Sequence, residues 1–128
     1  MRRSATFYYA LFCGVFLLLQ GATTLAARLI PSVDQALPGL LATTQMVPTH
    51  SLLHIATALL GFWTFWTGAA ATRYFAIGFG LFYVGLGVFG WYSGLQLCLG
   101  LQKFDHPFHI ILGGLGLAAF GLSRKAVR

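Results

Sequence analysis

Residues 54–61 read HIATALLG and residues 109–116 read HIILGGLG. Both stretches begin with a histidine and an isoleucine, and both end with a glycine at the same place. Glycines recur by chance in apolar helices, but histidines rarely do, so His54 and His109 in register indicate duplication. The chain is therefore predicted to contain one structural unit twice, with a histidine at the same position in each copy.

The composition is typical of an integral membrane protein. Of the 128 residues, 58% are hydrophobic and only 8% are charged, and the mean hydropathy is +0.79. That is too few charged groups to cover a water-soluble surface. The length allows about four spans of roughly 20 residues and leaves no room for a second domain. We expect an all-α integral membrane protein with a single domain, residues 1–128.

Four apolar segments are the predicted transmembrane helices: 6–27, 50–68, 74–95 and 107–122. Backbone groups in lipid must be satisfied within a segment, and none of these runs has the alternation of a membrane strand. Arg2 and Arg3 before the first run also fit a signal peptide. We interpret the run as a retained helix, because aligning Tyr9 with Phe75 also matches its glycines with those of the third segment.

The repeat is thus predicted as a helix pair used twice, over residues 6–68 and 74–122. Because each copy has two spans, both copies enter the membrane in the same direction, and the pseudo-axis runs along the membrane normal. The connection inside the first copy, residues 28–49, is longer than its partner and is expected to form an irregular cap.

Basic residues predict the orientation. An even number of spans puts both termini on one side, together with a short turn expected at Arg73. That side holds most of the cations: Arg2, Arg3, Arg73, Arg124, Lys125 and Arg128. The other side pairs two cations with two acids: Arg28, Lys103, Asp34 and Asp105. By the positive-inside rule both termini are cytoplasmic and all histidines face outward. The net charge of +6 is then a topology signal, and no nucleic-acid partner is expected.

Small residues along the third and fourth segments predict close helix packing, because in lipid they let backbones approach each other. The candidate packing glycines are Gly78, Gly80, Gly87, Gly90, Gly94, Gly113, Gly114 and Gly116. The spacing of Gly90 and Gly94 also permits contact with another membrane subunit or with a second copy.

The outward histidines are the candidate site. His50 and His54 are four residues apart, so they share one face of a helix. Asp105 and His109 have the same spacing in the fourth segment, with His106 between them. Ionisable groups at membrane depth are costly and suggest function. Helix-end hydrogen bonding is nevertheless the favoured interpretation of these side chains.

Three cofactor alternatives remain open beside that interpretation. A metal such as zinc needs three or four ligands, for which the candidates are His50, His54, Asp105 and His109. Haem needs two facing imidazoles, and the symmetric choice is His54 with His109. A chlorophyll-type pigment needs one imidazole and an apolar wall. The wider cofactor set comprises His50, His54, His106 and His109.

Two stretches carry a resemblance to a known family: THSLLHIATALLG, from Thr49, and FDHPFHIILGGLG, from Phe104. Over its whole length the chain is similar to an uncharacterised family of small bacterial four-helix membrane proteins, classified as a domain of unknown function. That family has His-x-x-x-His at its second helix and an acid and a histidine at the same spacing at its fourth. Where the family usually has asparagine, this chain has Ser51 and His106. The resemblance implies a bacterial inner or thylakoid-like membrane and no known activity.

These observations predict a non-enzymatic accessory or structural subunit of a larger membrane complex, photosynthetic or respiratory, in contact with lipids. No nucleophile is paired with a base, and almost no mass lies outside the spans. A cofactor binder at the outward face is the first alternative. A small transporter or channel is the second, for which Gln20, Thr57 and Thr64 are the candidate polar residues within the spans.

Overall fold

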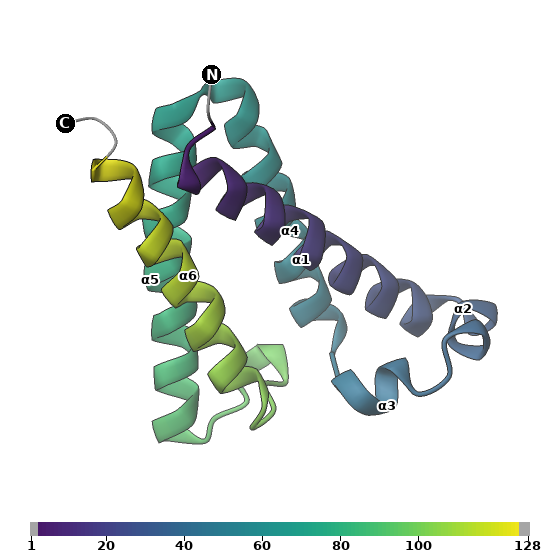
Figure 1. The fold of residues 1–128 in the computed structure, drawn as a ribbon. Coiled ribbons are helices and arrows are strands. Elements are labelled where there is room, and N and C mark those ends of the chain that lie inside the picture. Colours follow the sequence, from purple (N-terminus) through teal and green to yellow (C-terminus); the bar gives the residue numbers. More distant parts are fainter. Residues whose placement is uncertain (1–2, 126–128) are drawn as a thin grey trace.

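The computed structural model describes residues 3–125, which form helices joined by short connections (Figure 1). No strand occurs in this part of the chain. The long helices are α1 (Ala5–Leu29), α4 (Pro48–Thr67), α5 (Ala69–Ser93) and α6 (Asp105–Lys125); the short ones are α2 (Pro31–Ala36), α3 (Leu40–Thr44) and the 3₁₀ helix η1 (Leu97–Leu99). The prediction of an all-helical protein is confirmed. Arg2 and Arg128, which entered the charge argument, lie outside the described residues, as do the side chains of Arg124 and Lys125.

Within residues 3–125, three helices are long and apolar enough to cross a membrane: α1, α5 and α6. Helix α4 has 20 residues but is not among them. Its sequence carries four threonines, a serine and two histidines, which lower its hydropathy. The structure is therefore compatible with a membrane protein, and a fourth span through α4 stays a prediction.

Each long helix lies where an apolar segment was predicted, but the connection between the second and third segments is different. The turn expected at Arg73 is wrong, because α5 begins at Ala69 and Arg73 lies within it. The chain reverses at Gly68, whose φ of +107° is open to glycine and strained for other residues. The residues just before Tyr74 are less apolar than those after it and so resemble a turn, although alanine favours helix.

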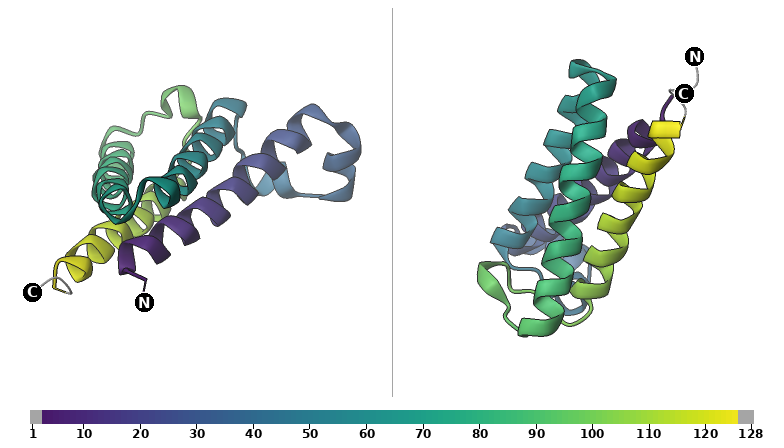
Figure 2. Two further views of the ribbon diagram at one scale, coloured as in Figure 1. Left: turned by 90° about the horizontal axis from the view of Figure 1, so that it is seen from above. Right: turned by 90° about the vertical axis from the view of Figure 1, so that its left-hand side faces the viewer.

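The long helices are arranged as two pairs, α1 with α4 and α5 with α6 (Figures 1 and 2). The pairs meet along a shared core, and α4 leads directly into α5 through Gly68. The core consists of tightly buried side chains, among them Tyr9, Ala10, Cys13, Leu17, Ala58, Phe75, Ala76, Tyr83 and Leu112. The short helices α2 and α3 extend from the far end of α1, where an irregular cap was expected (Figure 1).

Glycines let the paired helices approach closely. A Cβ at Gly80 would lie 2.8 Å from a side-chain carbon of Leu117, and one at Gly113 would lie 2.6 Å from the carbonyl oxygen of Gly80. Of the predicted packing glycines, five have such close neighbours: Gly80, Gly87, Gly90, Gly113 and Gly116. The other three, Gly78, Gly94 and Gly114, have no atom within 4 Å of the place a Cβ would occupy, so they do not serve packing within the described chain. Gly94 instead ends α5 in the left-handed region, with φ of +65°.

Candidate metal site

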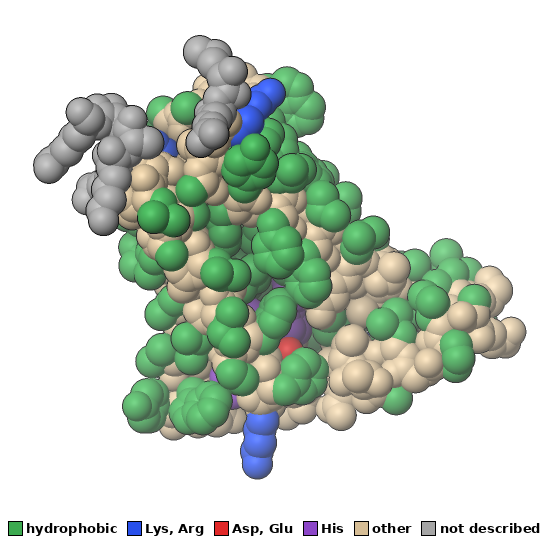
Figure 3. Space-filling view, viewed as in Figure 1, with side chains coloured by type: hydrophobic (Ala, Val, Ile, Leu, Met, Phe, Trp, Pro, Cys, Tyr) green, Lys and Arg blue, Asp and Glu red, His purple; other side chains and the backbone are tan. Residues whose placement is uncertain are grey.

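Three histidines from two helices converge in the core of the protein. His50 and His54 lie on α4, and His109 lies on α6. Their exposed fractions are 1%, 1% and 0%. Figure 3 shows histidine side chains at the bottom of the hollow between the two helix pairs, in the half of the molecule away from the termini. The sequence predicted these histidines at the starts of two helices, and the structure brings the three imidazoles together.

The rings form a compact triangle. The centroid of His50 lies 4.6 Å from that of His54 and 5.7 Å from that of His109, and the third side measures 6.4 Å. Each residue offers a ring nitrogen that lies within 4.8 Å of the chosen nitrogens of the other two. No other group of this kind is found among the described residues. We call His50, His54 and His109 the histidine triad.

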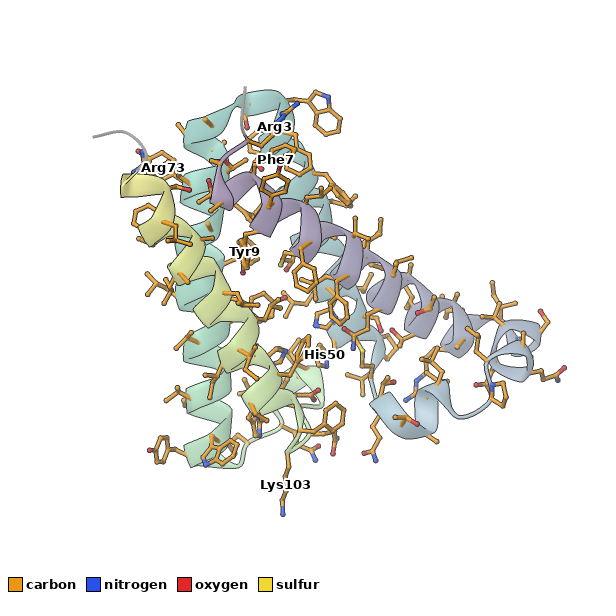
Figure 4. The ribbon with its side chains drawn as sticks, in the orientation of Figure 1. Arg3, Phe7, Tyr9, His50, Arg73 and Lys103 are labelled. Carbon is orange, nitrogen blue, oxygen red and sulfur yellow. The ribbon has the colours of Figure 1, made fainter. Side chains whose placement is uncertain are left out.

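Local structure fixes where the triad forms. Pro48 occupies the first turn of α4, where its missing N–H costs nothing. The start of α4 is held against α1 by a hydrogen bond between the hydroxyls of Ser51 and Thr24, 2.8 Å apart, and by the guanidinium of Arg28, which donates to the carbonyl of Met46. His50, labelled in Figure 4, and His54 share one helix face, and both rings lie near that of His109 on α6.

None of the six ring nitrogens of the triad has a hydrogen-bond partner among the described residues. A buried polar group without a partner costs about 1–3 kcal/mol, so three such imidazoles side by side are expensive. The interpretation that they form hydrogen bonds to helix ends finds no such bond among these residues. A ligand that accepts several imidazole lone pairs at once would remove that cost.

Asp105, a predicted fourth metal ligand, lies outside this triad. Its Oδ2 accepts a hydrogen bond of 2.7 Å from the backbone N–H of Gln102, so the carboxylate closes the turn that leads into α6. It still interacts electrostatically with His50. Asp105 therefore holds the start of α6 and does not join the three histidines as a ligand.

His106, a predicted cofactor ligand, is also separate from the triad. It is 7% exposed, and its Nδ1 is buried without a partner among the described residues. Its ring lies over Gly90, where a Cβ would come within 2.5 Å of Nδ1. Gly90 thus makes room for the His106 ring between α5 and α6.

The triad fits a metal ion better than a macrocycle. Tetrahedral zinc, with Zn–N distances of about 2.0–2.1 Å, holds its ligand nitrogens about 3.3 Å apart. The triad nitrogens lie within 4.8 Å of one another, which is near that spacing. A haem plane between His54 and His109 would have to displace His50, whose ring contacts both. A chlorophyll-type ring needs a flat space beside one imidazole, and each imidazole here is enclosed by protein.

Tyr83 is a neighbour of the triad that the sequence did not indicate. Its ring centroid lies 5.2 Å from that of His109, and the side chain is fully buried. The Tyr83 hydroxyl lies 3.3 Å from the hydroxyl of Thr57, which is on the same side of α4 as His54. The one available signal was a tyrosine in the middle of an apolar helix, where its hydroxyl needs a partner.

Comparisons with protein families, with curated proteins and with solved structures find no match for this chain.

Proposed function

We propose that this chain is a membrane protein that binds one transition-metal ion through His50, His54 and His109. The single observation that carries the proposal is the triad itself, with three buried imidazoles in contact and no hydrogen-bond partner among the described residues. Neutral imidazole is a common ligand of zinc, copper, nickel and iron. Zinc is the ion we expect, because three histidines are an established zinc set that leaves one position for water.

The proposed membrane arrangement has four spans, with α4 as the second. Helix α4 is nearly as long as its neighbours and packs along α1, which is apolar enough to span. Between its end residues Thr49 and Thr67, which are exposed, its polar residues face inward: Ser51, Thr57 and Thr64 are buried, whereas Leu59, Trp63 and Trp66 are exposed.

Arg3 and Arg73 lie at the end that holds both termini, and Lys103 lies at the other (Figure 4), as does Arg28 in the last turn of α1. The sequence adds four cations close to the two termini, and this excess supports cytoplasmic termini.

Equivalent contacts support the proposed duplication. Gly14 on α1 meets Phe62 on α4, and Gly80 on α5 meets Leu117 on α6, as the alignment of the two copies requires. Gly61 meets the carbonyl of Ala10 and the ring of Phe75. Gly116 meets their aligned counterparts, the carbonyl of Ala76 and the ring of Tyr9. The hydroxyls of Thr6 and Thr72, which are also aligned, lie 3.4 Å apart across the junction of the two copies.

In this arrangement the metal has a structural consequence. His54 and His109 are the aligned pair, while His50 and Asp105 are aligned but chemically different. The site therefore adds a third imidazole to a duplicated pair and joins one helix pair to the other. A metal-fixed bundle suits the proposed role as a non-enzymatic accessory subunit of a larger membrane complex, such as a photosynthetic or respiratory one. The transporter alternative has no specific observation in its favour.

Cobalt substitution tests the proposal. The purified protein, treated with a chelator and then titrated with Co²⁺, is expected to bind one equivalent and to develop the intense visible bands of a tetrahedral site. The double variant His54→Gln, His109→Gln should lose these bands and retain less than a tenth of the metal. His106→Gln is the matched control, because it removes a buried histidine of α6 outside the triad, and it should bind as the parent does.

Two results would contradict the proposal. One is a parent protein that binds no Co²⁺ and no Zn²⁺ at micromolar concentration while it stays folded. The other is binding that is lost equally in the triad variant and in His106→Gln. A Soret or chlorophyll absorption band in protein from its native membrane would instead support the macrocycle alternatives.

A further inference from the structure

An apolar groove of about 680 Å³ runs between α4 and α5 on the surface of the bundle. Its walls are apolar and aromatic side chains, with Leu60 and Trp63 on α4 and Tyr74, Phe79 and Phe82 on α5. Gly78 forms part of its floor, and a Cβ there would meet no atom within 4 Å. The volume is in the range of sites that hold organic ligands, roughly 300–1,000 Å³.

Apart from the Tyr74 hydroxyl and the Trp63 indole N–H at one end, the groove offers no free hydrogen bond to an occupant. Its two threonines, Thr57 and Thr64, are buried, and their hydroxyls donate to the carbonyls of Leu53 and Gly61 on their own helix. A quinone head group or a sugar along the groove would lose its hydrogen bonds to water and regain few of them. A hydrocarbon chain has no polar group to satisfy, so it is the chemistry that this lining accepts.

The corresponding seam on the other side of the bundle is filled. The alignment of the two copies matches the α4–α5 seam with the seam between α6 and α1. Phe12 stands there in place of Gly78, and Phe108 stands in place of Leu53. The rings of Phe108 and Phe16 pack at 5.6 Å, and Phe12 stacks on Phe16 at 5.9 Å. Two smaller residues, Gly78 and Leu53, therefore open the groove in one copy only.

The length and the ends of the groove point to a lipid. From Ala71 to Phe82 the lining covers about 16 Å at a rise of about 1.5 Å per residue. One leaflet of hydrocarbon is about 15 Å thick. Trp63 and Tyr74, 57% and 75% exposed, stand near the end at Gly68, as interfacial aromatic residues do.

We propose that the groove between α4 and α5 binds one acyl chain of a phospholipid, with its head group at the end that holds Trp63 and Tyr74. The chain covers the rings of Phe79 and Phe82 and runs along the open floor at Gly78. The Trp63 indole and the Tyr74 hydroxyl then lie at the level of the head group, where such side chains are favoured. This proposal depends on the membrane placement proposed above and is independent of the metal.

Native mass spectrometry tests the site. The protein, reconstituted in phosphatidylglycerol and then delipidated in mild detergent, is expected to retain one phospholipid. Gly78→Leu fills the groove floor and should reduce retention at least fivefold. Gly85→Leu is the matched control, since Gly85 is another exposed glycine of α5 with open space where a Cβ would stand, and it should retain the lipid. Leu53→Phe, which copies Phe108, should act like Gly78→Leu if the latter folds poorly.

A second readout places the chain in the groove. In a protein with Trp66→Phe and Trp91→Phe, the fluorescence of Trp63 should be quenched by phosphatidylglycerol with brominated acyl chains, and less so in Gly78→Leu. Equal retention and quenching in the parent and in both groove variants would overturn the proposal. Metal binding should be the same in all these variants, so a negative result for the lipid would not contradict the proposed metal site.

Discussion

The imidazole rings of His54 and His109 lie 6.4 Å apart and nearly perpendicular, at 86°, although each belongs to a different helix pair. His54 is on α4, which packs along α1, and His109 is on α6, which packs along α5. With His50 completing the triad, a bound ion connects the two pairs at the end away from Gly68. A metal there would fix the angle between the pairs as well as satisfy three imidazoles.

Zinc is therefore expected to stabilise the protein against unfolding. A ligand at 100 times its dissociation constant adds about 2.7 kcal/mol to the free energy of unfolding if it binds only the folded state. The measurement is the midpoint of thermal unfolding, followed by the reaction of buried Cys13 with a thiol dye in a Cys98→Ser protein. The midpoint should rise with zinc and fall with chelator. An identical midpoint in both conditions would show that the triad holds no ion.

Without a metal, the three histidines of the triad should lower the stability of the folded protein. Replacing His50, His54 and His109 together by leucine removes polar groups that have no partner, each of which costs about 1–3 kcal/mol. In chelator the triple variant is expected to unfold at a higher midpoint than the parent, and zinc should no longer raise it. A lower midpoint in chelator would mean that these imidazoles are held by hydrogen bonds to water, and that their role is structural.

Much of this site was within reach of the sequence, because its elements are local. Histidines four residues apart share a helix face, and the aligned histidines predict equivalent helix starts in the two copies. Asp105 was predicted as a ligand from the same spacing. Its carboxylate instead caps the turn at Gln102, a local hydrogen bond that competes with any distant partner.

The remaining features depend on how the two helix pairs cross, which residue spacing does not encode. Tyr83 approaches His109 only because α5 and α6 pack closely along their glycines. In the sequence Gly78 and Gly80 are both small residues of one apolar helix. In the structure Gly78 lines the groove, whereas Gly80 packs against Leu117 of α6. The reversal at Gly68 was missed because hydropathy falls gradually there, whereas the backbone conformation changes at one residue.

Two neighbouring glycines of α6 should differ sharply in their tolerance of a methyl group. A Cβ at Gly113 would lie 2.6 Å from the carbonyl oxygen of Gly80 and from the backbone nitrogen of Val84, and backbone atoms cannot move aside cheaply. Gly113→Ala should lower the stability by about 1–3 kcal/mol through overpacking. Gly114→Ala has open space and should be neutral or slightly stabilising, since alanine favours helix. The check is the unfolding midpoint of both variants, and equal midpoints would contradict the packing.

The orientation in the membrane can be checked with the native cysteines. Cys98 is exposed in the connection that contains η1, at the end away from Arg73, and Cys13 is buried in the core. With cytoplasmic termini, a membrane-impermeant maleimide should label Cys98 in intact cells and leave Cys13 unlabelled. Thr67→Cys in a Cys98→Ser protein is the opposite control, because Thr67 is exposed beside Gly68. It should react only in inverted membranes. Labelling of Cys98 in inverted membranes alone would indicate the opposite orientation, with the histidine triad in the cytoplasmic half of the bundle.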